Sequence, residues 1–245
     1  MRKRVGLKDR SSRGLGRYEN YRPWVRVSEI SSRGTTAEVV DWKHGRTVQC
    51  LSDGEMMLYH ILRWNDDVDD INESFPLPLE DTLEIAEMYG YNHPRDITTK
   101  EPKNMTSDFL VWLKDGSRIV YSLIDSRKTV HTELCTGDNA KKRAVRTLEK
   151  LAIEKYYWEH YAYDGAKPVL WRIVYKEDID VRYADNIRRV VEYYDVKNVH
   201  DRISAVKHLI AVKQIKVNMK GVGLDYTRIA DEHEEEIKWL NTNMA

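Results

Sequence analysis

The chain has 245 residues, of which 41% are hydrophobic and 33% charged, enough for one large or two small domains with a packed core. Its 40 basic and 40 acidic side chains cancel, so any nucleic-acid contact must come from local basic patches. Cys50 and Cys135 lie far apart without a Cys/His cluster, which excludes a disulfide framework and a cysteine-based zinc site. No run approaches the roughly 18 apolar residues of a membrane span, and we expect a cytoplasmic protein without a signal peptide or membrane contact.

Residues 1–20 are rich in Arg, Gly and Ser and lack apolar periodicity. This composition predicts a flexible basic arm that becomes ordered only against an acidic partner, with Arg13 and Arg17 among its DNA contacts. The opposite end, residues 231–236, is acidic. Such asymmetry is typical of a protein that binds nucleic acid or a charged partner, although solvated tails also show it.

Residues 21–51 contain three short candidate strands, 24–27, 37–40 and 47–51, which predict a small sheet. A helix follows over residues 52–64. Ser52 and Glu55 form a capping box at its start, and capping alone is enough to explain the glutamate. Glu55 can also belong to a site if this end of the helix lies over the strands that follow.

An acidic stretch at residues 66–72 superficially resembles a calcium loop. It lacks the central glycine and closing glutamate of such a loop, so a solvated turn before a strand at 71–77 is the favoured interpretation. A short helix is expected at residues 80–89. A loop rich in Pro, Lys and Thr then leads to Asp108.

Residues 106–128 read as a β-hairpin, because two apolar runs flank Asp115-Gly116, a pair suited to a two-residue turn. On that register Lys114 faces Ser117 and Asp108 faces Leu123.

The same register places Asp108, Asp125 and Arg127 on one side of the hairpin, near its open end, with Lys128 pointing the other way. Carboxylates hold hard divalent cations such as Mg²⁺, for which Mn²⁺ can substitute, and a neighbouring cation positions water and phosphate. This arrangement suits a magnesium-dependent nuclease. An ordinary hairpin with a charged outer face is the alternative.

A long helix is predicted over residues 139–161, with an apolar face of Val145, Leu148, Leu151 and Ala152. Cations crowd its first turns, where they oppose the helix dipole and so favour an external anion such as DNA phosphate. These candidate DNA contacts are Lys141, Lys142, Arg143 and Arg146.

A buried strand is expected at residues 169–175. Beyond residue 178 we expect helices at 184–194 and 199–212 and a glycine-turned hairpin around 220–223, the outline of a winged-helix module. A small helical cap that binds protein fits equally well, because no recognition helix stands out. The predicted organisation is therefore an arm (1–20), an α/β domain (21–178) and a small, mostly helical domain (179–245).

Several phrases in this order resemble TnsA, the endonuclease subunit of heteromeric cut-and-paste transposases. They are Tyr21-Arg22-Pro23-Trp24, Leu51-Ser52-Asp53-Gly54-Glu55, Trp64, Phe75-Pro76-Leu77, Ser107-Asp108-Phe109-Leu110-Val111, Lys114-Asp115-Gly116, Arg146-Thr147-Leu148-Glu149-Lys150-Leu151 and Tyr157-Trp158. The resemblance covers about residues 21–175.

The resemblance implies a restriction-endonuclease-like fold of the PD-(D/E)xK superfamily, a mixed sheet flanked by helices that binds magnesium. It further implies that the chain cuts the 5′ ends of a transposon in double-stranded DNA, beside a partner transposase and an ATP-dependent regulator that contacts the C-terminal domain. By position, the family's metal-binding glutamate falls on Glu55 and its aspartate on Asp108, while Glu154 is only a neighbour of the site.

The third family element, Gln/Glu-x-Lys, departs from the pattern. Asp125-Ser126-Arg127 matches it after one inserted residue, and Ser126-Arg127-Lys128 keeps the lysine but loses the carboxylate. Arginine cannot exchange a proton near neutral pH, although it grips phosphate with two hydrogen bonds. Two alternatives to a transposase nuclease therefore stay open: a phage or restriction nuclease of the same fold, and a scaffold that has lost its metal and binds DNA or protein.

Overall fold

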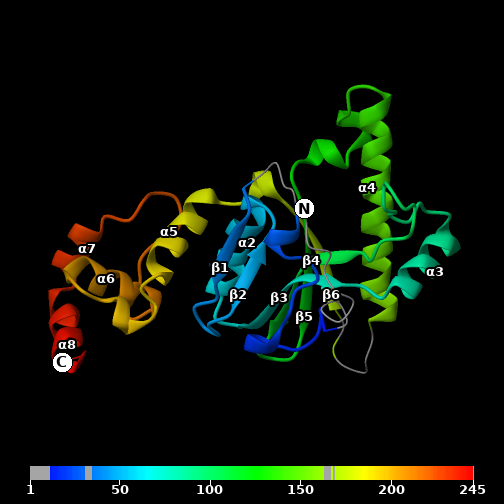
Figure 1. Cartoon of the computed structure of the whole chain (residues 1–245). Helices are drawn as coiled ribbons and strands as arrows, with labels where there is room; N and C mark the ends of the chain where they lie inside the picture. The colour runs from blue at the N-terminus through cyan, green and yellow to red at the C-terminus, as the bar shows by residue number, and fades with distance from the viewer. Residues whose placement is uncertain (1–11, 31–34, 163–166, 168, 245) are drawn as a thin grey trace.

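The computed structural model describes residues 12–30, 35–162, 167 and 169–244, and its centre is a mixed four-stranded sheet (Figure 1). The strand order is β3-β4-β5-β6, with β3 to β5 antiparallel and β6 parallel to β5. A separate hairpin, β1-β2, packs beside it. The strands are β1 (Ala37–Val40), β2 (Thr47–Cys50), β3 (Val68–Pro76), β4 (Thr106–Leu113), β5 (Arg118–Ile124) and β6 (Val169–Tyr175).

Helices cover both faces of this sheet because its central strands are apolar on both sides (Figure 1). On one face, helix α2 (Asp53–Trp64) packs against Phe109 and Val111. On the other, helix α4 (Asp138–Tyr156), with α3 (Leu79–Tyr89) beside it, covers Leu110 and Val120. The predicted fold class, a restriction-endonuclease-like mixed sheet flanked by helices, is confirmed.

The β4-β5 turn differs from the prediction by one residue. Phe109 pairs with Tyr121, and the Leu113 N–H donates to the Ser117 carbonyl at 2.8 Å, so the turn has three residues rather than two. Asp115 accepts hydrogen bonds from the Ser117 N–H and hydroxyl (2.9 and 2.6 Å), and Gly116 takes the left-handed position (φ 83°). The predicted pairing of Asp108 with Leu123 through the backbone ladder is therefore wrong.

The N-terminal segments also depart from expectation. Residues 12–20, predicted to be part of a flexible arm, pack on the protein, with the Gly14 N–H bonded to the Arg22 carbonyl at 2.7 Å; residues 1–11 of that arm lie outside the described residues. No strand forms at 24–27. The predicted solvated turn is shorter than expected, since β3 already begins at Val68 and buries Asp70.

The C-terminal region is helical, as predicted, but has no wing. Its helices are α5 (Val181–Val191), α6 (Arg202–Ala211), α7 (Tyr226–Glu232) and α8 (Glu234–Met244). Residues 212–225 are all described and form no strand. The Asn186 amide holds this segment instead, donating to the carbonyls of Met219 and Val222 at 2.9 Å each. No helix among the described residues is long and apolar enough to cross a membrane.

Candidate active site

Glu55 lies in the first turn of α2, where Ser52 is the N-cap as predicted, but the reciprocal half of the predicted capping box is shifted by one residue, from the Ser52 N–H to the Leu51 N–H. Its N–H donates to the Ser52 hydroxyl at 3.1 Å, and its own carboxylate accepts from the Leu51 N–H at 2.8 Å. Burial and the charge of Asp108 raise the pKa of Glu55 to about 7. The capping glutamate therefore also belongs to a group of interacting carboxylates.

Gly54 explains how the start of α2 comes so near to the sheet. A Cβ atom at this position would lie 2.9 Å from Leu123 Cδ2 and 3.2 Å from Lys176 Cδ. A side chain at this position would therefore require the Leu123 or Lys176 side chain, or the helix itself, to shift. Lys176 in turn bonds Asp53 at 2.8 Å, which fastens the same end of α2 to the residue that follows β6.

Asp108 lies on β4 at the point where β4 and β5 stop pairing. Its Oδ2 accepts a hydrogen bond from the Leu123 N–H at 2.6 Å, so the side chain replaces the backbone partner that the ladder lacks there. Burial raises the pKa of Asp108, Lys150 and the Leu123 hydrogen bond lower it, and Asp125 raises it further. Asp108 on β4 thus interacts with groups from β5, α4 and the segment after β5.

Glu154 on α4 is the most buried acid of the site, at 2% exposure, and its Oε1 has no hydrogen-bond partner among the described residues. Burial raises its pKa to about 7; Lys150 lowers it, Asp108 raises it, and the hydroxyls of Ser107 and Ser122 lower it. The resemblance predicts only a neighbour of the site here. The available signal was a glutamate three residues after Leu151 on the core-facing side of the helix.

Two tryptophans hold these hydroxyls in place. The Trp158 indole donates to Ser107 Oγ at 2.8 Å, and the Trp171 indole donates to Ser122 Oγ at 3.0 Å. The hydroxyls near Glu154 are therefore positioned by one buried and one half-buried tryptophan.

The third predicted element is not part of a strand. β5 ends at Ile124, and Ser126 caps a short 3₁₀ helix, Arg127–Thr129. Asp125 is exposed, yet its charge raises the pKa values of both Asp108 and Lys176.

The cations of this segment are placed differently from the hairpin prediction. Arg127 pairs with Glu177 at 2.8 Å and Asp178 at 2.5 Å, and it lies over the Tyr175 ring. Lys128 is exposed. The strand geometry on which Asp108, Asp125 and Arg127 are predicted to share one side ends before Asp125.

The chemistry of this group fits a hard divalent cation. The side chains of the group offer carboxylate oxygens, and one buried oxygen of Glu154 has no hydrogen-bond partner among the described residues. A bound cation would also relieve the repulsion between the carboxylates of Glu55 and Asp108. Within the described residues no three His, Cys, Asp or Glu side chains already lie close enough together to hold an ion. Mg²⁺ commonly binds through one or two carboxylates, with water and substrate phosphate completing its shell.

The predicted DNA contacts divide into two sets. The cations on the first turns of α4 are exposed: Lys141, Lys142, Arg143 and Arg146. Arg13 is buried and bonds Glu29 at 2.6 Å, while Arg17 bonds Asp69 at 2.7 Å. Arg13 thus holds parts of the segment 12–30 together, and Arg17 ties this segment to β3.

The face of α4 toward the sheet is rotated from the prediction. Ala144, Leu151 and Ile153 are buried, whereas Val145 and Leu148 are 45% and 43% exposed. The exposed pair lies among the exposed cations of the same helix.

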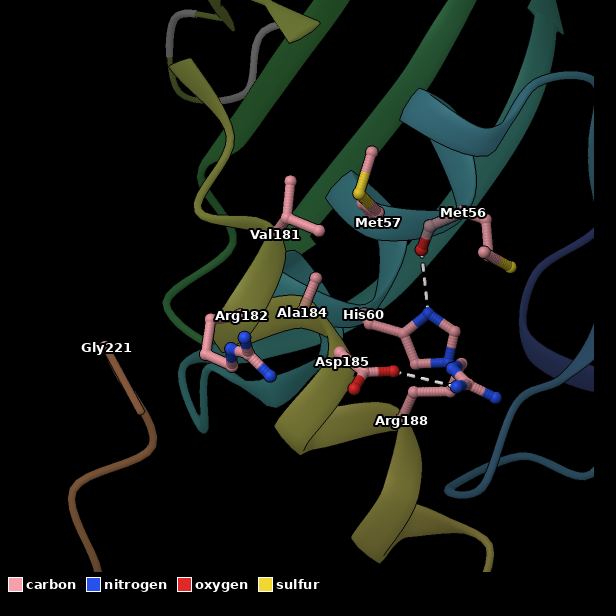
Figure 2. A pocket seen from close by; sticks show the side chains of 9 residues that line it. All are labelled: Met56, Met57, His60, Val181, Arg182, Ala184, Asp185, Arg188 and Gly221. Carbon is pink, nitrogen blue, oxygen red and sulfur yellow. Dashed lines mark hydrogen bonds and ion pairs between the residues drawn. The ribbon is translucent and has the colours of Figure 1, made fainter. Parts of the chain in front are cut away.

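A cavity of about 680 Å³ lies between α2 and α5 (Figure 2). Met56 and Met57, which directly follow Glu55, line it from α2, and Ala184 and Arg188 line it from α5. His60 Nδ1 lies 2.7 Å from the Met56 carbonyl. Helix α5 packs against α2, and the cavity between them lies next to the turn that carries Glu55.

Comparison with known proteins agrees with this geometry. Residues 65–174 match the family model described as "TnsA-like endonuclease N terminal". The chain is also 32% identical over 183 residues to the transposon Tn7 transposition protein TnsA of Escherichia coli. Over residues 65–174 the chain is therefore similar to the TnsA-like endonuclease family.

The TnsA resemblance of the sequence is thus confirmed, and the aligned region covers 75% of this chain. The chain spans 60% of the length of the Escherichia coli TnsA. The TnsA-like model includes Asp108, Asp125 and Glu154, and it begins ten residues after Glu55.

Proposed function

We propose that this chain is a metal-dependent DNA endonuclease that acts as a subunit of a heteromeric transposase and cuts the 5′ ends of a transposon. The observation that carries the proposal is the interacting group of Glu55, Asp108 and Glu154 at the open end of β4 and β5. The similarity of the chain to TnsA-like endonucleases supports the same proposal.

Glu55, Asp108 and Asp125 are the proposed ligands of Mg²⁺, for which Mn²⁺ would substitute, and Glu154 adds negative charge beside them. The bound cation would supply a Lewis acid and a more acidic water. Hydrolysis adds the water oxygen to phosphorus and breaks one bridging P–O bond, and the water proton goes to the leaving oxygen. The Leu123 N–H holds Asp108 in one orientation for this role.

The proposed partners are double-stranded DNA, a partner transposase and an ATP-dependent regulator. The printed name of the Escherichia coli relative, a transposition protein, supports the transposase setting. The exposed cations at the start of α4 support a DNA contact through Lys141, Lys142, Arg143 and Arg146. The C-terminal helices α5 to α8 are the proposed contact for the regulator.

The decisive experiment measures Mn²⁺ binding by calorimetry with a short DNA duplex present, because phosphate can complete the coordination shell. We expect stoichiometric binding by the wild type and at least tenfold weaker binding by Asp108→Ala. Asp138→Ala, which removes an exposed acid at the start of α4, is the matched control. Equal binding by wild type and Asp108→Ala would contradict the site assignment.

One observation favours a second function, a nuclease-like scaffold that binds DNA or protein without metal. Arg127, which occupies the place of the family lysine in one alignment, is paired with Glu177 and Asp178. On that hypothesis neither wild type nor Asp108→Ala binds Mn²⁺, while both bind the duplex with the same affinity.

A further inference from the structure

A cavity of about 970 Å³ lies between α3, the loop at residues 91–100 and α4. Its wall on the α4 side consists of Arg146, Thr147 and Lys150. The charged side chains that line it are the cations Arg95, Lys100, Arg146 and Lys150 and the carboxylates Glu87 and Asp96.

The cavity carries a surplus of positive charge, because four cations and two carboxylates line it. One of these carboxylates, Asp96, is already neutralised. Asp96 accepts hydrogen bonds from the backbone N–H groups of Thr98 and Thr99, at 2.8 and 3.0 Å, and pairs with Lys103 at 3.3 Å. A concave surface with surplus cations suits a chain of phosphates.

One face of α4 leads from this cavity to the carboxylates of the site. Arg146, Lys150 and Glu154 are spaced by four residues and so lie one above another on the helix. Their exposure falls along this line, since Arg146 is exposed, Lys150 half-buried and Glu154 buried. The cavity and the carboxylate group are therefore neighbours through Lys150.

Lys150 interacts electrostatically with two acids of the site, because its charge lowers the pKa values of Asp108 on β4 and Glu154 on α4. In the described part of the chain its ammonium group is in ion-pair contact with no carboxylate. Arg127, by contrast, is held by two acids. Lys150 is thus the half-buried cation that borders the carboxylates and still has hydrogen-bond donors for a ligand.

We propose that Lys150 contacts the phosphate that is cut, and that the cavity between α3, residues 91–100 and α4 holds the DNA backbone on one side of the cut. This inference rests on the proposed nuclease function. Lys150, on a helix, would take the role of the lysine in the Gln/Glu-x-Lys motif of the family. Arg95 and Lys100 would contact the DNA strand that is cut.

The test measures binding of a short DNA duplex in Ca²⁺ over a range of salt concentrations. Each lost phosphate contact lowers the slope of log affinity against log salt by about one. We expect this loss in Lys150→Met and in the double variant Arg95→Ala/Lys100→Ala. Lys155→Met is the matched control, because Lys155 lies on the same helix but pairs with Glu159 at 3.7 Å.

Nicking of the same duplex in Mn²⁺, with partner proteins added where cutting needs them, supplies the second measurement. Lys150→Met should cut at least 100-fold more slowly than wild type, and Lys150→Arg should recover part of the rate because it restores the cation. A slope and rate equal to those of Lys155→Met would overturn the inference while leaving the nuclease proposal intact. Loss of DNA binding by the wild type itself would overturn both.

Discussion

Glu154 shows most clearly how the interior of this protein opposes charge. It is a carboxyl group at 2% exposure, with Asp108 as an acidic neighbour and Lys150 as its cationic one. An ionised acid in such a place persists only when it is paired or bound to a cation. The chemistry proposed for the site and the stability of the fold therefore depend on the same side chain.

The first prediction concerns the pH dependence of metal binding. Burial and Asp108 raise the pKa of Glu55 to about 7, so this group is mostly protonated below pH 7 and must lose its proton to hold a cation. Mn²⁺ affinity should rise roughly tenfold per pH unit on approaching pH 7 and level off above it. Calorimetry from pH 5.5 to 8.5 checks this.

Asp108→Asn supplies the control, because removal of the neighbouring charge lowers the pKa of Glu55. Any binding that remains in this variant should reach its plateau at lower pH. A plateau at the wild-type pH would show that Glu55 is not the titrating ligand.

The second prediction concerns stability in the absence of metal. The folded-state pKa of Glu154 is raised to about 7 from 4.5, so the folded state holds this proton more tightly than the unfolded chain. The resulting stabilisation is complete below about pH 4.5 and is lost as pH rises to 7. Glu154→Gln stays neutral, so in EDTA it should be more stable than wild type at pH 8, by on the order of 1 to 3 kcal/mol.

Urea unfolding at pH 5 and pH 8 measures this difference. The two proteins should unfold at similar urea concentrations at pH 5. A gain of equal size at both pH values would contradict the assigned cause, since amide packing does not titrate.

At the residue scale, sequence reasoning reached Glu55 and Asp108 but misplaced their surroundings. The Ser52-x-x-Glu55 pattern located the start of α2, because N-cap preferences depend only on local spacing, and the TnsA resemblance pointed to Glu55 within it. The geometry of Asp125 and Arg127 could not be predicted, because a one-residue difference in the turn changes which side chains share a face. Glu177 and Asp178, the partners of Arg127, are about fifty residues away in sequence.

At the scale of elements, the approach of α2 to the ends of β5 and β6 determines where Glu55 lies. The third prediction is that Gly54→Ala weakens Mn²⁺ binding at least tenfold, because its Cβ would lie 2.9 Å from Leu123 Cδ2. Alanine in a helix is favoured over glycine by about 1 kcal/mol, so loss of the helix is not the expected cause.

The double variant Gly54→Ala/Leu123→Ala tests this steric explanation. Leu123→Ala removes the atom that the new methyl group would meet, so metal affinity should partly return. Full retention of Mn²⁺ binding in Gly54→Ala alone would contradict the argument that this contact positions Glu55.

A buried ion pair joins the β1-β2 hairpin to the sheet. Arg46 and Glu73 pair at 2.6 Å, and Glu73 also accepts from the Gln49 N–H at 3.0 Å. The fourth prediction is that Arg46→Met destabilises the fold by roughly 3 to 5 kcal/mol, because it leaves the Glu73 charge buried and unpaired. Urea unfolding checks this value, and Arg46→Met/Glu73→Gln should recover much of the loss.

At the scale of the whole molecule, α2 belongs to two cores at once. Its residues Leu58 and Tyr59 pack under the sheet, Trp64 packs against the core of the C-terminal helices, and Ile61 packs against both cores. The prediction of a separate winged-helix module missed this sharing. Periodicity identifies an apolar helix face but not which distant helix covers it.

The fifth prediction follows from this shared helix. Ile187 on α5 is fully buried, and Ile187→Ala should destabilise the C-terminal core by roughly 2 to 5 kcal/mol. Hydrogen exchange should then increase in α2 as well as in α6, because α2 loses support on that side. An increase confined to α5 through α8 would show that the two cores open independently.

The position of α5 behind Glu55 has a consequence for assembly. A protein that binds α5 to α8 and stabilises α2 in the position seen here would raise the metal affinity of the site. Coupling between two binding sites is reciprocal. Metal and DNA would then tighten the hold of that protein by the same factor. Helix α2 would thereby couple metal binding, and with it DNA cleavage, to assembly of the complex.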